Sequence, residues 1–320
     1  MRYTVDKRKE KGYNKKKSKR WQKMRKYIIV TDSCCDLTKE ERREYDIEYI
    51  PMYCVYNGES HYADLDWTDE ERENFYQMMN DGVRITTAQI TQAEYEAYFE
   101  EKLKAGYDIL YISCSSALTA SVDASRRAGE GLLVNYPEAK VRTVDSLNAC
   151  RGLGMLCLTA SEMRAEGKSL DEVADWLEEH KLEANQECTP EKLTYLKQAG
   201  RVSAASAFFG ALLSIKPIIV SDKKGRNLAV EKVKGRRNSL IRLVERMQER
   251  YIDVPYQKVS ILHAVCPEDA EFLRQEVVAR FPQLEGKITM SWIGPIIGAT
   301  CGPGIIALYF FGKKVEDGDE

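Results

Sequence analysis

Residues 27–41 read YIIVTDSCCDLTKEE, and this stretch decides the fold class. It opens with the apolar run YIIV at 27–30, which predicts a buried strand. A turn follows, and Thr38 then precedes Glu41 by three residues, the Ser/Thr-x-x-Glu capping pattern that begins a helix. A strand followed directly by a helix is the building unit of α/β proteins with a parallel sheet.

The same unit recurs along the first half of the chain. The capping pattern returns at Thr68/Glu71, Thr91/Glu94 and Ser169/Glu172. Two more β-branched apolar runs, at 108–112 and 140–144, predict strands, and a helical stretch follows each of them. This alternation predicts a parallel sheet flanked by helices, and ligand sites on such sheets lie at the carboxyl ends of the strands.

The second half of the chain follows a different pattern. Two apolar runs at 217–220 and 227–233 flank a Lys-Lys-Gly turn and predict a β-hairpin. Further elements are expected as helices at 206–215, 236–250 and 267–281 and as a strand at 259–263. A hairpin combined with helices indicates a mixed α/β domain.

Length and charge divide the chain into regions. With 320 residues and 43% hydrophobic content, it is long enough for two α/β domains, which we expect at 27–175 (parallel sheet) and 176–313 (mixed α/β). Residues 1–26 contain 13 basic and two acidic residues and are expected to form a disordered basic tail, and 314–320 an acidic tail. Contact of the basic tail with RNA or an anionic lipid is left open.

The composition outside the basic tail excludes several functions. It holds 35 basic and 48 acidic residues, a net charge of −13, whereas nucleic-acid binding depends on neutralising phosphates. The tail itself has no apolar segment of the kind found in secretory signals. Nine cysteines include no C-x-x-C pair, and none of the three histidines lies beside a cysteine at ligand spacing. We therefore expect a cytoplasmic protein with reduced thiols, no metal and no nucleic-acid partner.

Motifs for catalysis are absent or incomplete. The segment GLGMLC at 152–157 lacks the third glycine of a dinucleotide fingerprint and lies inside an expected helix. Asp32 and Asp36 follow the first strand, but their spacing does not suit an aspartyl nucleophile, and Asx turns are the simpler interpretation of Asp32 and Asp145. We expect no catalytic residue and no cofactor.

The 21 residues at 292–312, WIGPIIGATCGPGIIALYFFG, carry no charge. Five glycines and two prolines argue against a membrane span, although the length would suit one. We expect a strand, a Gly-Pro loop at 298–304 and a second strand, with the loop close to an apolar ligand. A buried hairpin corner without a ligand is the alternative.

Hydroxyl-bearing side chains gather in two turns of the first half. Thr86 and Thr87 lie in the segment ITTAQIT, which links a strand to a capped helix, and Ser115, Ser116 and Thr119 lie in SCSSALTAS, which precedes another helix. Hydroxyls at a helix N-terminus suit a carboxylate or a phosphate. Ordinary helix capping is the alternative.

Eight segments of the chain carry a resemblance to a known family. They are YIIVTDSCCDL (27–37), ITTAQIT (85–91), ISCSSALTASVDASR (112–126), VDSLNACRGLG (144–154), YLKQAGRVS (195–203), LLSIKPII (212–219), KVKGRR (232–237) and IGATCGPG (297–304). In this order they resemble the DegV family of fatty-acid-binding proteins, which includes the fatty-acid-carrier subunits of bacterial fatty acid kinase. The resemblance implies two α/β domains with an acyl tunnel between them.

The resemblance also implies residue roles. In the family's T-S-Q-P-S and S-S-x-L-S-G-T motifs, hydroxyls hold the carboxyl group of the fatty acid. The matching residues are Thr86, Thr87, Ser115, Ser116 and Thr119. Thr300 replaces the family's histidine in the loop that contains Gly298. Arg201 follows Gly200 at a helix end, and the resemblance puts it beside the kinase docking site, where its planar guanidinium suits phosphate.

We therefore expect a lipid-binding carrier that is not itself an enzyme. It would bind a long-chain fatty acid in the interdomain tunnel and present the carboxyl group to a separate ATP-dependent fatty acid kinase, a step that feeds phospholipid synthesis. The alternative is an enzyme that acts on a small carboxylated or phosphorylated metabolite at the same strand ends. A nucleic-acid or membrane-surface adaptor that uses the basic tail is a third hypothesis, which the acidic body opposes.

Overall fold

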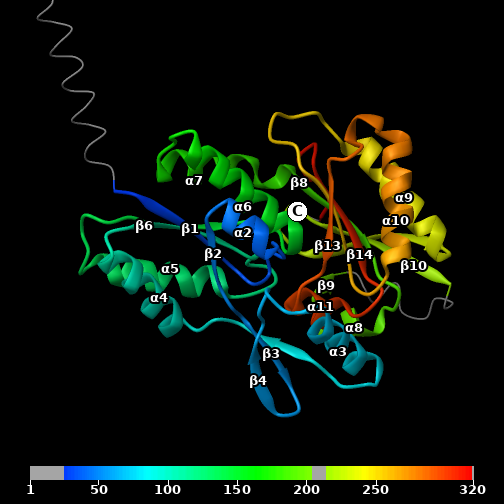
Figure 1. The fold of residues 1–320 in the computed structure, drawn as a ribbon, viewed down its shortest axis with the longest axis horizontal. Helices are drawn as coiled ribbons and strands as arrows, with labels where there is room; N and C mark the ends of the chain where they lie inside the picture. Colours follow the sequence, from blue (N-terminus) through cyan, green and yellow to red (C-terminus); the bar gives the residue numbers. More distant parts are fainter. Residues whose placement is uncertain (1–24, 204–213, 319–320) are drawn as a thin grey trace, which may run out of the picture.

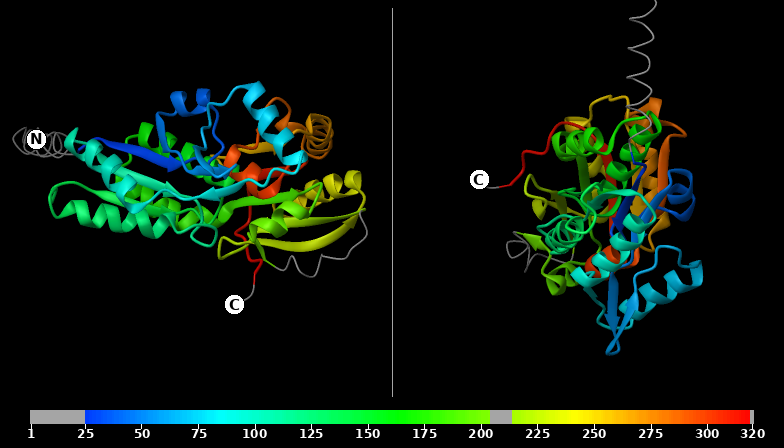
Figure 2. Two further views of the ribbon diagram at one scale, coloured as in Figure 1. Left: turned by 90° about the horizontal axis from the view of Figure 1, so that it is seen from below. Right: turned by 90° about the vertical axis from the view of Figure 1, so that its left-hand side faces the viewer.

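The structure, a computed structural model, describes residues 25–203 and 214–318. Within these ranges the chain forms a four-stranded, a seven-stranded and a three-stranded sheet, with helices packed against the two larger ones (Figure 1). The two larger sheets lie side by side along the long axis of the molecule (Figure 2). The expected α/β class, with a parallel sheet first and a mixed sheet second, is confirmed. The domain boundary at 175–176 stays a prediction.

The first sheet is entirely parallel, in the order β2-β1-β6-β7. Its strands are β1 (Tyr27–Asp32), β2 (Ile47–Ile50), β6 (Asp108–Ser113) and β7 (Val141–Asp145). Helices α4 (Gln92–Lys104) and α5 (Ser121–Leu133) cover one face, and α6 (Cys150–Ala165) and α7 (Leu170–His180) cover the other (Figure 1). The central strands β1 and β6 are buried on both faces, which explains their continuous apolar runs.

All four expected capping boxes are confirmed. Thr38, Thr68, Thr91 and Ser169 each accept the N–H of a glutamate three residues later, and the glutamate carboxylate accepts the N–H of the cap residue. These caps begin α2 (Lys39–Glu44), α3 (Asp69–Asn80), α4 and α7. Because each cap satisfies donors that a helix start leaves unpaired, local chemistry sets where these helices begin.

The second sheet is mixed, in the order β13-β12-β14-β8-β10-β11-β9. Its strands are β8 (Ala184–Thr189), β9 (Val202–Ser203), β10 (Ile215–Ser221), β11 (Asn227–Lys234), β12 (Val259–His263), β13 (Ile288–Trp292) and β14 (Ile306–Phe311). The expected hairpin, β10 with β11, is confirmed, and α9 (Arg236–Arg250) and α10 (Pro267–Arg280) pack against the sheet. Helix α6 contacts β8 and β14 as well as the parallel sheet. The helix expected at 206–215 lies largely outside the described residues, and its last position begins β10.

A small antiparallel sheet, in the order β4-β3-β5, projects from the body beside α3 (Figure 1). Its strands are β3 (Tyr53–Tyr56), β4 (Glu59–Tyr62) and β5 (Thr86–Ala88). Thr86 and Thr87, expected in a segment that links a strand to a capped helix, lie in a short strand that pairs with β3. Pairing with a distant strand is a tertiary effect that the local composition does not reveal.

The uncharged segment 292–312 differs from its prediction in one respect. It contains the end of β13 and all of β14, but Pro295–Cys301 form a helix, α11, where the end of the first strand and the start of the loop at 298–304 were expected. A proline is tolerated in the first turn, because no intrahelical N–H bond is lost there. The helix packs against α3 and α8 (Thr194–Ala199) and ends at Gly302, whose φ of +77° favours glycine. The hairpin alternative is also wrong, because β12 lies between β13 and β14.

Candidate functional site

A cavity of about 750 Å³ is lined from both large sheets. Cys34 and Cys114 come from the loops that follow β1 and β6, at the carboxyl ends of these parallel strands. The mixed sheet contributes Cys188 from β8, Ile219 from β10 and Tyr309 from β14. Residues of α8 and α11 add to the lining. The cavity therefore lies at the strand ends where α/β proteins commonly bind ligands.

The buried part of the cavity wall is mostly apolar, with Gln186 as a buried polar lining residue. Aliphatic side chains come from Leu118, Leu196, Ile219, Ile293, Ile296, Ile297 and Ile305. Cysteines contribute Cys34, Cys114, Cys150, Cys188 and Cys301. Burial raises the pKa of Cys301 to about 12 and the pKa of Cys188 well above its usual value, so these thiols are neutral and behave as small apolar groups. The volume falls in the range of small-molecule sites, roughly 300–1,000 Å³.

Polar groups gather where the cavity reaches the protein surface. Thr87, Gln89 and Ala120 are exposed there, and Thr119 is half-buried. The Oε1 atom of Gln89 accepts the Ala120 N–H at 3.0 Å and the Thr119 hydroxyl at 3.4 Å. Ala120 precedes α5 and provides no side-chain cap. Two donors thus converge on one acceptor oxygen close to the positive end of a helix dipole.

Four of the predicted site residues line this cavity: Thr87, Thr119, Arg201 and Thr300. Thr86 lines a smaller pocket of about 250 Å³, which shares Thr87, Arg201 and Thr300 with the cavity. The hydroxyl of Thr300 donates to the Ile296 carbonyl at 3.1 Å, so it is already bonded within its own helix.

Ser115, Ser116 and Gly298 lie outside the residues that line the cavity. The buried hydroxyl of Ser115 donates to the Gly225 carbonyl at 2.8 Å, whereas Ser116 is exposed. A Cβ atom on Gly298 would lie 2.5 Å from the Tyr76 hydroxyl. Glycine at 298 thus permits the close approach of α11 to α3, and the three residues influence the cavity only through neighbouring structure.

Arg201 is exposed at the rim of the cavity. Its Nε donates to the Leu118 carbonyl at 3.0 Å, and its Nη1 donates to the Ala199 carbonyl at 3.3 Å. The first of these bonds connects the end of α8 with the hydroxyl-rich loop before α5. The two bonds hold a cationic group beside the polar end of the cavity.

Sequence patterns missed several lining residues. Gln89 lines the cavity together with its chain neighbours Thr87 and Ala88. Gln186 and Cys188 of β8 line it because side chains alternate between the two faces of a strand, whereas Glu187 between them faces the other way. The alternation of side chains along a strand, with a period of two residues, was the signal available in the sequence. It does not indicate which face of the strand lines a cavity.

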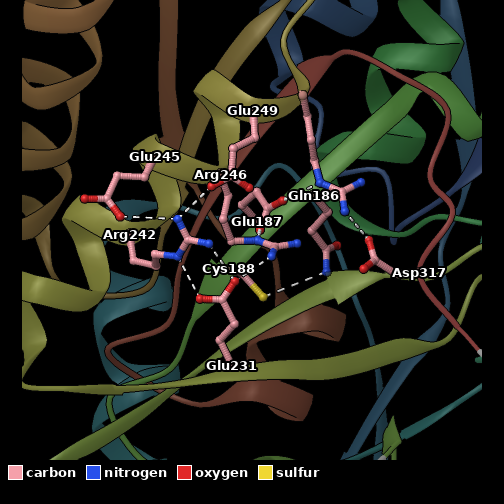
Figure 3. A network of polar contacts seen from close by, with 10 residues as sticks. Gln186, Glu187, Cys188, Glu231, Arg242, Glu245, Arg246, Glu249 and Asp317 are labelled. Atoms are coloured by element: carbon pink, nitrogen blue, oxygen red, sulfur yellow. Dashed lines mark hydrogen bonds and ion pairs between the residues drawn. The ribbon is translucent and has the colours of Figure 1, made fainter.

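Glu187 belongs to an ion-pair network on the side of β8 that faces α9 (Figure 3). Its carboxylate accepts Arg246 Nε at 2.6 Å, and Arg246 Nη1 donates to Glu231 at 2.7 Å. Arg250 extends the network to Asp317 near the C-terminus at 2.5 Å. Strand β8 therefore separates this network of charged side chains from the cavity.

The expected Asx turns at Asp32 and Asp145 are confirmed. Each carboxylate accepts a backbone N–H two residues later, from Cys34 at 2.9 Å and from Leu147 at 3.0 Å. Asp32 is fully buried, and this burial raises its pKa despite the hydrogen bonds that it accepts. These contacts give Asp32 a structural role at the end of β1.

The described ranges contain neither a metal-binding cluster of histidine, cysteine and carboxylate side chains nor a membrane span. Residues 25–203 and 214–318 contain no group of three or more histidine, cysteine, aspartate and glutamate side chains arranged to hold a metal. In the same ranges, every helix is too short or too polar to traverse a bilayer.

Two docked sheets with a large cavity at the parallel strand ends define a mixed α/β protein with one main ligand-sized site. The chain belongs to the DegV family, because residues 26–313 match the sequence model described as "Uncharacterised protein, DegV family". A DegV domain-containing protein of Clostridium perfringens is 35% identical over 293 residues, which cover 92% of this chain and 100% of that relative. The resemblance inferred from the eight sequence segments is thus confirmed.

Solved structures of related proteins share the fold. A DegV family protein from Thermus thermophilus, described as fatty-acid binding, has a TM-score of 0.78 at 25% identity. DegV from Bacillus subtilis, described as a fatty acid binding protein, has a TM-score of 0.76 at 26% identity. Each comparison covers 90% of this chain and 100% of the other chain.

Proposed function

We propose that the protein binds a long-chain fatty acid in the cavity, which serves as a tunnel between two α/β domains. In this proposal the protein presents the carboxyl group to a separate ATP-dependent fatty acid kinase. One observation carries the proposal: the buried wall is mostly apolar, whereas converging donors lie at the exposed end. A ligand with a long apolar chain and a single polar end matches this division. The fatty-acid-binding descriptions of the two related structures support the assignment.

The two parts of such a ligand contribute differently to binding. At about 0.8 kcal/mol per buried methylene, a dozen methylenes contribute on the order of 10 kcal/mol before the costs of association. Each neutral hydrogen bond to the carboxyl group adds only about 1 kcal/mol. The acyl chain therefore sets the affinity, and the donors set the orientation of the carboxyl group.

Gln89 indicates where the carboxyl group would bind. A carboxylate oxygen in place of Gln89 Oε1 would accept the same two hydrogen bonds, from Ala120 and Thr119, and would bind more strongly because it is charged. Thr87 and Thr300 supply further hydroxyls on the cavity wall. In this complex the Thr300 hydroxyl rotates away from the carbonyl that it now contacts.

The exposed position of these donors supports presentation to a partner. A carboxyl group held at the cavity mouth is accessible to a second protein, and Arg201 adds a guanidinium at the rim that suits a phosphate. The kinase would supply ATP and the catalytic groups, so the proposal assigns no catalytic residue, metal or cofactor to this chain. We place the carrier in the cytoplasm, where the activated acyl group would enter phospholipid synthesis.

Native mass spectrometry of the purified protein, followed by organic extraction, tests the proposal. We expect a co-purified fatty acid of about 14 to 18 carbons, long enough to fill a largely apolar cavity. Gln89→Glu places a fixed carboxylate at the proposed head-group position, so loading of free acid should fall by about tenfold or more. Gln92→Glu makes the same change in charge on α4, outside the lining residues, and should load normally.

A protein that carries no lipid and gains no thermal stability from added oleate would contradict the proposal. A co-purified small polar metabolite would instead favour the enzyme alternative.

A further inference from the structure

Three residues with sulfur-containing side chains, Cys34, Met52 and Cys114, line the same cavity. Cys34 and Cys114 follow the neighbouring strands β1 and β6, and their backbone N–H groups donate to the same carboxylate, that of Asp32. The Sγ atom of Cys34 lies 3.3 Å from the Sδ atom of Met52. All three residues line the cavity, and their exposed fractions are 2% to 4%. The sulfur atoms are thus sheltered from bulk solvent but reachable through the cavity.

A buried carboxylate holds the two cysteines in place. One oxygen of Asp32 accepts the Cys34 N–H at 2.9 Å, and the other accepts the Cys114 N–H at 3.0 Å. The Tyr111 hydroxyl donates to the second oxygen at 3.1 Å and fixes the carboxylate. A single side chain therefore joins the loops after two strands and holds the two cysteines close together before any ligand binds.

The adjacent residue positions the methionine. The Ser33 hydroxyl accepts the Met52 N–H at 2.9 Å. Ser33 lies between Asp32 and Cys34 in the chain. One turn after β1 thus organises all three sulfur-bearing residues. Ligand groups that are positioned by their own hydrogen-bond partners are typical of built metal sites.

We propose that Cys34, Cys114 and Met52 form a copper(I) site in the cavity wall. Thiolate and thioether sulfurs select copper(I), whereas carboxylate, carbonyl and water ligands suit harder cations. A single ion at a usual metal–sulfur distance of about 2.3 Å can reach two sulfurs that are 3.3 Å apart. Neither histidine nor a carboxylate is among the described lining residues, which leaves sulfur as the main donor there.

Binding exchanges a proton for the metal ion. Copper(I) replaces at least one thiol proton, which is released to solvent, and the thiolate then balances the charge of the ion. This inference does not rest on the proposed fatty acid ligand.

Anaerobic titration of the full-length protein with copper(I), in competition with the chelator bathocuproine disulfonate, tests the site. The wild-type protein should retain one tightly bound equivalent. Cys34→Ser and Cys114→Ser should each weaken this first equivalent by about tenfold or more, and Met52→Leu by a smaller factor. The matched control Cys301→Ser removes a lining thiol that is not part of the trio and should leave the first equivalent unchanged.

Because the protein has seven other cysteines, only the comparison between variants assigns the first copper(I) equivalent to the proposed site. Equal affinity for the first equivalent in all five proteins would overturn the proposal, as would nitrogen or oxygen ligands in the X-ray absorption spectrum of the one-equivalent complex. Thermal melts of each variant check folding. Met52→Leu changes no thiol and nearly keeps the side-chain shape, so an unchanged affinity and sulfur coordination in this folded variant would remove Met52 from the site and contradict the proposal.

Discussion

The two faces of strand β8 carry opposite kinds of buried chemistry. Gln186 and Cys188 face the cavity as neutral groups, whereas Glu187 between them is paired with Arg246 beneath α9 (Figure 3). A buried charge is stable only when it is paired and hydrogen-bonded. The arginines of α9 meet that condition on one face, and the neutral side chains of the other face leave the cavity suitable for an apolar chain.

Asp36 is a buried carboxyl group near the cavity that accepts no hydrogen bond from an arginine among the described residues. It is 4% exposed and accepts the thiol of Cys150, a lining residue, at 2.9 Å. Burial raises its pKa to about 7, although hydrogen bonds from Cys150 and from the Gly294 N–H oppose this change. Burial raises the pKa of Glu187 to about 7 as well, although Arg246 and Arg250 oppose this change. The two carboxyl groups therefore differ in their partners: Glu187 pairs with arginines on the α9 side of β8, whereas Asp36 accepts a neutral thiol near the cavity.

The largest effect is expected from breaking the ion pair beneath β8. Glu187→Ala leaves Arg246 buried without its closest partner, so the free energy of unfolding should fall by about 3–5 kcal/mol. Urea denaturation measures this loss. Glu249→Ala is the matched control, because its half-exposed carboxylate pairs with Arg242 at the surface, and it should cost about 0.5 kcal/mol or less. A loss below about 1 kcal/mol for Glu187→Ala would show that the pair is not required.

A smaller effect should appear in the pH dependence of stability. The ordinary pKa of Asp36 is 3.8 and its folded value is about 7, so the folded protein holds a proton that the unfolded chain has released. The resulting stabilisation is complete below about pH 4 and is lost as the pH rises through about 7. Relative to Asp36→Asn, which tolerates the φ of 47° at this position, the wild-type protein should lose roughly 2–4 kcal/mol across that window. Parallel pH profiles for the two proteins would disprove the shift.

On the cavity side, removing hydroxyls should affect the acid more than its ester. Thr87→Val combined with Thr119→Val keeps the side-chain shapes but removes two donors from the cavity wall. Affinity for the fatty acid should fall by about tenfold, because a charged acceptor loses hydrogen bonds. Fluorescence displacement with the acid and with its methyl ester measures both constants. Equal losses for the two ligands would mean that these residues only shape the wall.

The smallest effect on lipid binding is expected at the rim. Arg201→Ala should change fatty acid affinity by no more than about threefold, yet sharply reduce acyl-phosphate production with a cognate kinase. Arg201→Lys should rescue only part of that loss, because it lacks the bidentate fork. Arg127→Ala, an exposed arginine on α5 outside the lining residues, should change neither quantity. Abolished lipid binding in Arg201→Ala would place the arginine in the ligand site instead.

Local patterns predicted most of the regular structure. The caps at Thr38, Thr68, Thr91 and Ser169 all formed, and helix α9 occupies the predicted residues 236–250. Such elements depend on side chains within a few positions of one another. Helix α11 was missed because its Gly-Pro composition indicates a loop, whereas packing of Gly298 against Tyr76 stabilises a helix.

By itself, the amino-acid sequence determined the DegV family, the α/β class and the segments that surround the cavity, because motif order and short-range periodicity are written along the chain. Only the tertiary structure decided which side chains of those segments meet. Thr87, Thr119 and Thr300 line one cavity, whereas Ser115 turns toward Gly225. The pairing of β1 with β6 and the docking of two sheets bring distant residues together. Gln89 and the sulfur trio therefore become visible as a group only in three dimensions, because their proximity depends on contacts far apart in the chain.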